Sequence, residues 1–277
     1  MRSKTLVDWN AFSILVEVVP PAHSNPEPVL SDLKEIARLP LTGFNIATNP
    51  VAKPRLSALA MAALIREQTG KPAVLHLTPR DHNRLALQSQ IWGAKALGID
   101  TVLVTSGDRP AAGPNADTSF VGDLTVFELI HLSTEAGLQV GVAFDPPRAK
   151  EQLSKAVERL AEKKAAGSGF AITQPAYQKE TARFWSSKLK KVGIPVLVGI
   201  LPLLSKKHAL FMDQHVAGIH IPAAILEAIN QSNQPANVGI ENARSIIQIS
   251  RGLFQGVCLM PPFQQYQLVA DLISSPG

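Results

Sequence analysis

Short apolar runs rich in β-branched residues alternate with helical patterns along the whole chain, and this alternation restricts the possible folds more than any other feature. One unit lies at 73–104. The runs 73–75 and 101–104 are strand-like, and between them apolar residues recur at helical spacing up to Gly98. Strands buried on both faces have such continuous apolar runs, and a helix between two of them is typical of a parallel sheet.

The same alternation predicts eight strands with helices between them. The strands are expected at 13–18, 43–46, 73–77, 101–105, 139–143, 170–173, 196–199 and 256–260. The helices are expected near 26–38, 54–69, 81–97, 123–136, 149–166, 177–192, 205–213 and 238–252, with an additional turn and helix at 216–232. Eight such units at a spacing of about 30 residues indicate a (β/α)8 TIM barrel.

An open, doubly wound sheet is the alternative α/β fold for this pattern. It is disfavoured because no glycine-rich dinucleotide-binding motif follows the first strand, where Pro20 and Pro21 stand instead. No linker rich in Pro, Gly or Ser divides the chain. We therefore expect a single barrel domain over residues 1–277, a length that one such barrel commonly has.

The composition, with 45% hydrophobic and 18% charged residues, is that of an ordinary soluble globular protein. No apolar run approaches the ~18 residues of a membrane-spanning helix, so no membrane span is expected. The stretch 12–19 lacks the layout of a signal peptide because Glu17 interrupts it. A single cysteine, Cys258, excludes an internal disulfide. A cytoplasmic location is therefore expected.

The charge pattern and the short motifs argue against several classes of protein. The net charge is +5, but Lys and Arg are mixed with acidic residues on the expected helices. No basic stripe is interleaved with aromatic residues, so nucleic-acid binding is not expected. The chain lacks the H-x-x-H, H-E-x-x-H and cysteine patterns of metal sites, and no metal is expected. The G-x-S-x-G motif of hydrolases is absent as well.

Polar side chains stand where several predicted strands end. Glu17, His76, Asp108 and Gln174 each close or follow an apolar run. Barrel enzymes carry their catalytic groups at this C-terminal end of the strands, whereas the opposite rim mainly supports the fold. In a barrel, these four side chains would converge on one mouth.

Each of these residues has a functional and a structural interpretation. Glu17 is surrounded by apolar residues, which raises the pKa of its carboxyl and suits it to proton transfer, but it could equally pair with a lysine. Asp108 follows Gly107 in a tight turn whose amides could bind a phosphate or a ring carbonyl, or it could cap a turn. His76 alone is more often a hydrogen-bonded core residue. Gln174 could bind the edge of a pterin or an amide, or bridge two strands.

Several longer motifs of this chain resemble those of the methylenetetrahydrofolate reductase family, from about Ser13 to Phe263. They are VEVVPP with Glu17, HLTPRDHNRLALQS, ALGIDTVLVTSGDRP with Asp108, GSGFAITQPAY with Gln174, VGILP and GVCLMPPF. The last motif, together with Asn49-Pro50, resembles the branch found in acetogen-type reductases and homocysteine-methyltransferase fusions. The shared order and spacing of the motifs carry the resemblance.

The resemblance implies a (β/α)8 barrel that holds FAD at the C-terminal ends of its strands. It further implies an oxidoreductase of one-carbon metabolism, which reduces 5,10-methylenetetrahydrofolate to the 5-methyltetrahydrofolate used in methionine biosynthesis. The hydride would come from NADH, NADPH or another electron donor by way of the flavin. In such enzymes the flavin carries the hydride chemistry, while the barrel positions and polarises it.

Carried over position by position, the resemblance implies roles for residues of the rim. Glu17 would be the general acid that opens the five-membered folate ring, and Asp108 would contact the pterin and stabilise the developing cation. Gln174 would hold the substrate or the nicotinamide, and His208 stands where a substrate-contacting Gln is common. The residues expected to contact FAD are His76, Ser106, Gly107, Asp108, Arg159 and Lys163.

The chain departs from the family pattern near the expected FAD site. Ser106 replaces an arginine that approaches the FAD phosphates, and Ala156 replaces a flavin-binding Asp. Ala47 stands where Thr is common, and Phe144 and Asp145 stand where a Tyr-Pro pair is common. Two alternatives stay open: a folate- or flavin-binding subunit that takes electrons from a partner protein, and a flavin-free barrel that acts on methyl-folate. A homo-oligomer also stays open.

Overall fold

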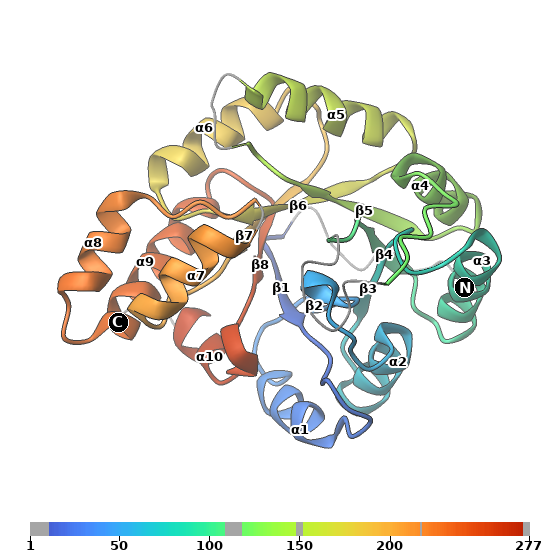
Figure 1. The fold of residues 1–277 in the computed structure, drawn as a ribbon, viewed down its shortest axis with the longest axis horizontal. Coiled ribbons are helices and arrows are strands. Elements are labelled where there is room, and N and C mark those ends of the chain that lie inside the picture. Colours follow the sequence, from blue (N-terminus) through green and yellow to red (C-terminus); the bar gives the residue numbers. More distant parts are fainter. Residues whose placement is uncertain (1–10, 109–117, 148–151, 217, 274–277) are drawn as a thin grey trace.

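Eight parallel strands close into a barrel in the computed structural model, which describes residues 11–108, 118–147, 152–216 and 218–273. The strands are β1 (Ser13–Val18), β2 (Gly43–Ile46), β3 (Ala73–Leu77), β4 (Thr101–Val104), β5 (Gln139–Phe144), β6 (Phe170–Pro175), β7 (Val196–Ile200) and β8 (Gly256–Leu259). The first strand pairs with both the second and the eighth, so no strand is left at an edge (Figure 1). The barrel prediction is confirmed, and the doubly wound alternative is excluded.

Helices form an outer ring around the strands (Figure 1). They are α1 (Glu27–Ile36), α2 (Ala58–Thr69), α3 (Arg84–Ala96), α4 (Val126–Glu135), α5 (Leu153–Ala165), α6 (Lys179–Leu189), α7 (Lys206–His215), α8 (Ala223–Gln231), α9 (Pro235–Ser250) and α10 (Leu268–Ile273). The additional helix expected at 216–232 is α8. None of the helices within the described ranges combines the length and the apolarity that a bilayer crossing needs.

The predicted elements are correct in kind and differ from the structure at their ends. All eight strands start where the sequence places them, and β6 continues two residues further, to Pro175. The helix expected from 54 begins at Ala58, because the side chain of Ser57 caps it by accepting a hydrogen bond from the amide of Ala60. The start of the helix expected at 149–166 lies outside the described residues up to 151. The short helix α10 was not predicted.

The interior of the barrel is filled by apolar side chains from alternate positions of the strands. This cluster consists of Leu15, Val74, Leu103, Phe170, Ile172, Leu197 and Cys258, with Met260 packed against it. Side chains along a strand alternate between its two faces, so Glu17 points to the same side as Leu15, one layer nearer the C-terminal end. The barrel therefore has an apolar floor, and polar residues occupy the layer above it.

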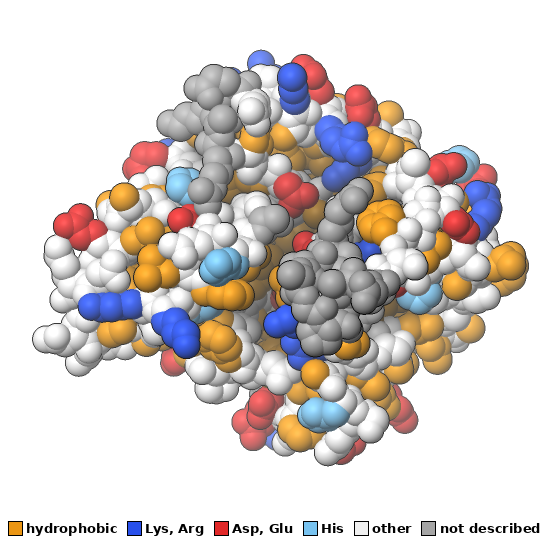
Figure 2. All heavy atoms as spheres, in the orientation of Figure 1, with side chains coloured by type: hydrophobic (Ala, Val, Ile, Leu, Met, Phe, Trp, Pro, Cys, Tyr) orange, Lys and Arg blue, Asp and Glu red, His pale blue; other side chains and the backbone are white. Residues whose placement is uncertain are grey.

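The residues above this floor belong to the C-terminal ends of the strands and the loops that follow them. Figure 2, in the orientation of Figure 1, shows a hollow near the centre of the face, bordered by hydrophobic, acidic and basic side chains. We call this hollow at the C-terminal rim the mouth of the barrel. It is the part of the fold in which barrel enzymes carry their chemistry.

Candidate active site

Glu17, the fifth residue of β1, stands inside the barrel just below the mouth. Part of the residue still faces the opening, but the protein packed around the carboxyl desolvates it, and this burial raises the pKa of Glu17 to about 7. No ion pair to Glu17 forms within the described residues, so the structure does not support the alternative that Glu17 pairs with a lysine. A carboxyl with this pKa can hold or release a proton near neutral pH.

The surroundings of Glu17 are uncharged. Asn45 on β2 is its paired neighbour in the sheet and is completely buried. The Asn45 side-chain amide donates a hydrogen bond to the sulfur of Cys258 at 3.6 Å. Burial, together with the nearby Glu17, raises the pKa of the Cys258 thiol, so the thiol stays protonated. Glu17 therefore has a neutral amide and a neutral thiol beside it, which adds to the cost of ionising its carboxyl.

His76 lies on the same interior face, on β3 next to the mouth. Burial lowers the pKa of its imidazole to about 3, so the ring is neutral at physiological pH. Its Nε2 atom is buried and has no hydrogen-bond partner among the described residues. Buried polar atoms in folded proteins nearly always have a partner. The unpaired nitrogen therefore marks a position that suits a polar atom of a bound ligand rather than a hydrogen-bonded core residue.

The turn after β4 carries Asp108 at the rim. Gly107 has a φ of 76°, and a Cβ atom there would lie 2.5 Å from the hydroxyl of Thr78, so only glycine fits. The carboxylate of Asp108 is exposed, and one of its oxygens accepts a hydrogen bond from the amide of Val51 at 2.7 Å. Asp108 thus links two loops of the rim, and the residues that follow it in its own turn lie outside the described ranges.

A buried arginine that the sequence analysis did not single out lies beneath this turn. Arg80, in the loop after β3, donates hydrogen bonds to the carboxylate of Asp81 and to the backbone carbonyls of Asn49 and Asp108. The adjacent Arg80-Asp81 pair in the motif HLTPRDHN is the one sequence feature that could have indicated this ion pair. Its partners lie on loops about 30 residues away in the chain, and no local pattern reports such contacts.

Gln174, near the end of β6, also lies at the mouth. Its amide nitrogen donates a hydrogen bond to a carboxylate oxygen of Asp145 at 2.7 Å, and its side chain packs beside Gly218. Gln174 therefore joins the end of β6 to the Asp145 side chain after β5, and no bond from its side chain to a strand backbone is found within the described residues. Glu17, His76, Asp108 and Gln174 all lie at the C-terminal rim, as the sequence predicts.

His208 lies in the first turn of α7 and faces an aromatic ring from the loop after β8. Its Nδ1 atom accepts a hydrogen bond from the amide of Leu204 at 3.3 Å, which places the ring proton on Nε2. Burial lowers the pKa of His208, so the ring is neutral. Phe263 is 71% exposed and has a φ of 56°. The centroid of its ring lies 4.9 Å from the centroid of the His208 ring. His208 can therefore act as a neutral donor, as a glutamine amide does.

Helix α5 presents two cations next to β5. The amino group of Lys163 donates a hydrogen bond to the carbonyl of Ala143 at 2.7 Å. Arg159, one turn earlier, lies over the ring of Phe127 at 5.0 Å. Burial lowers the pKa of Lys163, Asp145 raises it, and the charge of Arg159 lowers it further. Because the two cations repel each other, an anion bound between them would be stabilised.

The residues that depart from the family pattern differ in whether they are exposed at the rim or buried in the core. Ser106 is exposed, and its backbone carbonyl accepts a hydrogen bond from Thr78. It brings a hydroxyl, but no positive charge, to the rim. Phe144 and Ala47 are buried, and Phe144 packs in the core outside the strands. Ala156 packs against the same core from α5. Of the departing positions, Ser106 and Asp145 are therefore the ones exposed at the rim.

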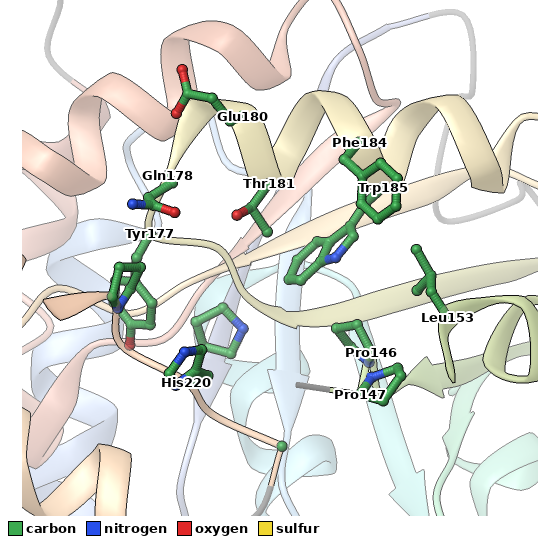
Figure 3. Close-up of a pocket in the computed structure, with 13 residues that line it drawn as sticks. Pro146, Pro147, Leu153, Tyr177, Gln178, Glu180, Thr181, Phe184, Trp185 and His220 are labelled. Atoms are coloured by element: carbon green, nitrogen blue, oxygen red, sulfur yellow. The ribbon is translucent and has the colours of Figure 1, made fainter. Parts of the chain in front are cut away.

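A pocket of about 290 Å³ lies beside the mouth, between the rim and helices α5 and α6. Trp185 and Phe184 form one wall and face Pro146 and Pro147 across the pocket (Figure 3). Pro175, which directly follows Gln174, lines it too. The pocket adjoins the mouth without including Glu17, His76 or Asp108.

A closed parallel barrel with an acid of raised pKa, a carboxylate and an amide at its C-terminal rim defines a (β/α)8-barrel enzyme. The model of the methylenetetrahydrofolate reductase family matches residues 2–259, and the chain belongs to this family. Its members are oxidoreductases that act on CH–NH groups. The acetogen-type branch is not resolved by this match and stays a prediction.

Known proteins agree with this assignment. The chain is 24% identical over 239 residues to "Probable methylenetetrahydrofolate reductase (NADPH)" of Caenorhabditis elegans, covering 82% of this chain and 35% of that protein. It is 25% identical over 266 residues to "Methylenetetrahydrofolate reductase 2" of Schizosaccharomyces pombe, covering 86% and 41%. The chain thus spans less than half the length of these relatives. A 2,3-dimethylmalate lyase structure (TM-score 0.52, 13% identity, covering 96% of this chain and 80% of that chain) shares the fold alone.

Proposed function

We propose that the protein reduces 5,10-methylenetetrahydrofolate to 5-methyltetrahydrofolate with a flavin cofactor. The observation that carries this proposal is Glu17, a carboxyl with a pKa of about 7 that reaches the mouth from a neutral interior. Opening the five-membered ring of the substrate requires a proton on the ring nitrogen that leaves. A carboxyl that is still protonated near neutral pH can deliver it.

Asp108 and Gln174 would complete the substrate site. Opening the ring leaves a positive charge on the substrate, and the carboxylate of Asp108 would stabilise that charge. Gln174 and the neutral His208 would hold the substrate or the nicotinamide of NADH or NADPH through their side-chain donors. The bond between Gln174 and Asp145 holds the glutamine amide in place before any ligand binds.

The residues present fit FAD. The unpaired Nε2 of His76 suits a polar atom of the flavin ring, and the two cations of α5 suit a phosphate. The residues that would hold the cofactor are His76, Ser106, Gly107, Asp108, Arg159 and Lys163. FAD, when bound, supplies the hydride that reduces the substrate. His76 and Gly107 would orient the ring, while Arg159 and Lys163 would hold the phosphates in place of the missing arginine at Ser106.

A partner protein as electron donor is the second candidate, and Ser106 favours it. Without a cation at that position, the phosphate site has fewer positive charges than the family pattern provides, which weakens the expected hold on FAD. In this version the barrel over 1–277 is a single cytoplasmic domain that binds folate and flavin and is reduced by another protein. A homo-oligomer is compatible with either version.

Purified protein tests the proposal directly. We expect the protein to bind FAD with quenching of flavin fluorescence, and the bound flavin to be reduced by NADH, NADPH or dithionite. Addition of 5,10-methylenetetrahydrofolate should then reoxidise the flavin and form 5-methyltetrahydrofolate. Reduction by dithionite alone would favour the partner-protein version. A protein that binds no FAD but still binds methyl-folate would be the flavin-free barrel, and the proposal would be wrong.

A further inference from the structure

Arg80 connects three loops of the rim from a buried position. The residue is 2% exposed, and its guanidinium uses two nitrogens to bind both carboxylate oxygens of Asp81, at 2.5 and 2.7 Å. Two further hydrogen bonds, each 3.1 Å long, go to the backbone carbonyls of Asn49 and Asp108. One side chain of the loop after β3 thereby holds the loops that follow β2 and β4.

Two further contacts close this arrangement into a ring. The side-chain amide of Asn49 donates a hydrogen bond to Asp81 at 3.1 Å, and the amide of Val51 donates one to the carboxylate of Asp108 at 2.7 Å. Asn49 and Val51 both have a positive φ, at 41° and 51°. A β-branched residue such as Val51 rarely adopts this conformation, which has to be held in place by the surrounding contacts.

The charges within the ring are distributed unequally. Burial would raise the pKa of Asp81, but hydrogen bonds from Arg80 and Asn49 outweigh it and hold this pKa below its usual value. Arg80 and Asp81 therefore form an ionised pair whose charges cancel. The guanidinium reaches the backbone carbonyl of Asp108, whereas the contact of the Asp108 carboxylate is with a backbone amide. The carboxylate of Asp108 is thus fixed in place without being paired to this buried cation.

We propose that Arg80 and Asp81 are positioning residues for Asp108. Arg80 fixes the backbone that carries the carboxylate, and Asp81 neutralises Arg80, so that Asp108 keeps a negative charge for the cation that develops on the substrate. This inference rests on the proposed function. A salt bridge that only stabilised the fold would affect stability without selecting one step of the reaction.

The substitution Asp81→Asn separates charge from shape. The amide is nearly isosteric and can still accept one hydrogen bond from Arg80, but the guanidinium then has an uncompensated charge close to Asp108. We expect reduction of methylenetetrahydrofolate to slow about tenfold or more, because the added positive charge opposes the cation on the substrate. Reduction of the bound flavin by its donor should change less than about twofold, since no cation forms on folate in that step.

Arg80→Met and the double variant test whether the two residues act together. If Asp81 acts by neutralising Arg80, Asp81→Asn should have no additional effect once Arg80 is methionine. Arg244→Met is the matched control. Arg244, on α9, also pairs with a carboxylate (Glu241) and donates to a backbone carbonyl (Asp271), but it lies away from the mouth. In the Arg244→Met variant, both half-reactions should proceed at wild-type rates.

Hydrogen exchange provides a second readout that needs no folate. In Arg80→Met, the amides of 48–53, including Val51, should exchange faster, while those of β2 and β3 stay protected. Wild-type exchange at 48–53 in this variant would overturn the positioning role of Arg80. Folate reduction within twofold of wild type in Asp81→Asn, or equal losses in both half-reactions, would overturn the role of Asp81. A wild-type protein that does not reduce folate would instead refute the proposed function, and the exchange experiment would still decide the role of Arg80.

Discussion

Glu17 and Asn45 are paired neighbours on β1 and β2, and the Asn45 amide is bonded to the sulfur of Cys258. Glu17 therefore faces neutral groups in a desolvated interior, and no cation offsets its charge among the described residues. Such a site favours the protonated acid and opposes the carboxylate. The fold thus holds a proton where the substrate would need it, at a cost in stability when the carboxyl ionises.

This cost predicts a pH-dependent effect of Glu17→Gln on stability. Because burial raises the pKa of Glu17 from 4.5 to about 7, the wild type loses stability as the pH rises through this range. At pH 8 the variant should gain up to about 3 kcal/mol relative to the wild type, and below pH 4.5 this gain should vanish. Urea unfolding at both pH values measures the difference. A difference that is the same at both would show that Glu17 is not desolvated.

Asp108→Asn should slow folate reduction without unfolding the rim. The amide oxygen can still accept the hydrogen bond from Val51, so the loop contact is kept while the charge is lost. We expect the folate step to fall by about 10²- to 10³-fold, the range seen when one group that stabilises a developing charge is removed. Asp123→Asn is the control, since Asp123 also accepts a backbone hydrogen bond, from Arg84, next to an adjacent helix. Equal losses in the two variants would argue against a role for the charge of Asp108.

His76 should bind flavin as a neutral ring. Since burial lowers the pKa of His76 to about 3, FAD affinity should show no step between pH 5 and 8 that depends on His76. Replacing His76 with Leu removes the unpaired Nε2 and should leave the free energy of unfolding unchanged or higher, while FAD affinity falls about tenfold. Fluorescence titration of FAD over this pH range provides the measurement. Unchanged affinity in the variant would place His76 outside the cofactor site.

The variant Lys163→Met should show whether Lys163 binds the phosphates of FAD or its flavin ring. If Lys163 and Arg159 bind the phosphates, FAD affinity should fall about tenfold, and riboflavin affinity should not change. Lys164→Met, one residue further along α5, is the matched control because its amino group donates to the carbonyl of Val192 instead. A loss of affinity for both ligands in Lys163→Met would indicate a structural role.

The sequence predicts the barrel well because each strand contains a short apolar run. Strands buried on both faces have that signature wherever they begin, which is why all eight starting positions agree with the structure. The ends of the strands are harder to predict from the sequence, because polar residues such as Gln174 extend β6 beyond its apolar run. The six-residue α10 is too short for a helical period to be visible.

The site is only partly predictable, for a physical reason. Glu17 and Asp108 stand next to strand ends, so a local pattern locates them at the rim. The contact between Asn45 and Cys258 joins residues 213 positions apart, and the hydrogen bonds of Arg80 join separate loops. These contacts form only when the barrel closes, so no local sequence pattern predicts them.

The most direct test of the account is rapid-mixing measurement of the two half-reactions in Glu17→Gln. Reduction of the bound flavin by NADH, NADPH or dithionite should proceed as in the wild type, because that step needs no proton on folate. Reoxidation by 5,10-methylenetetrahydrofolate should slow by about 10²-fold or more, the usual contribution of a positioned general acid. Equal losses in both half-reactions, or folate reduction at the wild-type rate, would contradict the assignment of Glu17 as the acid.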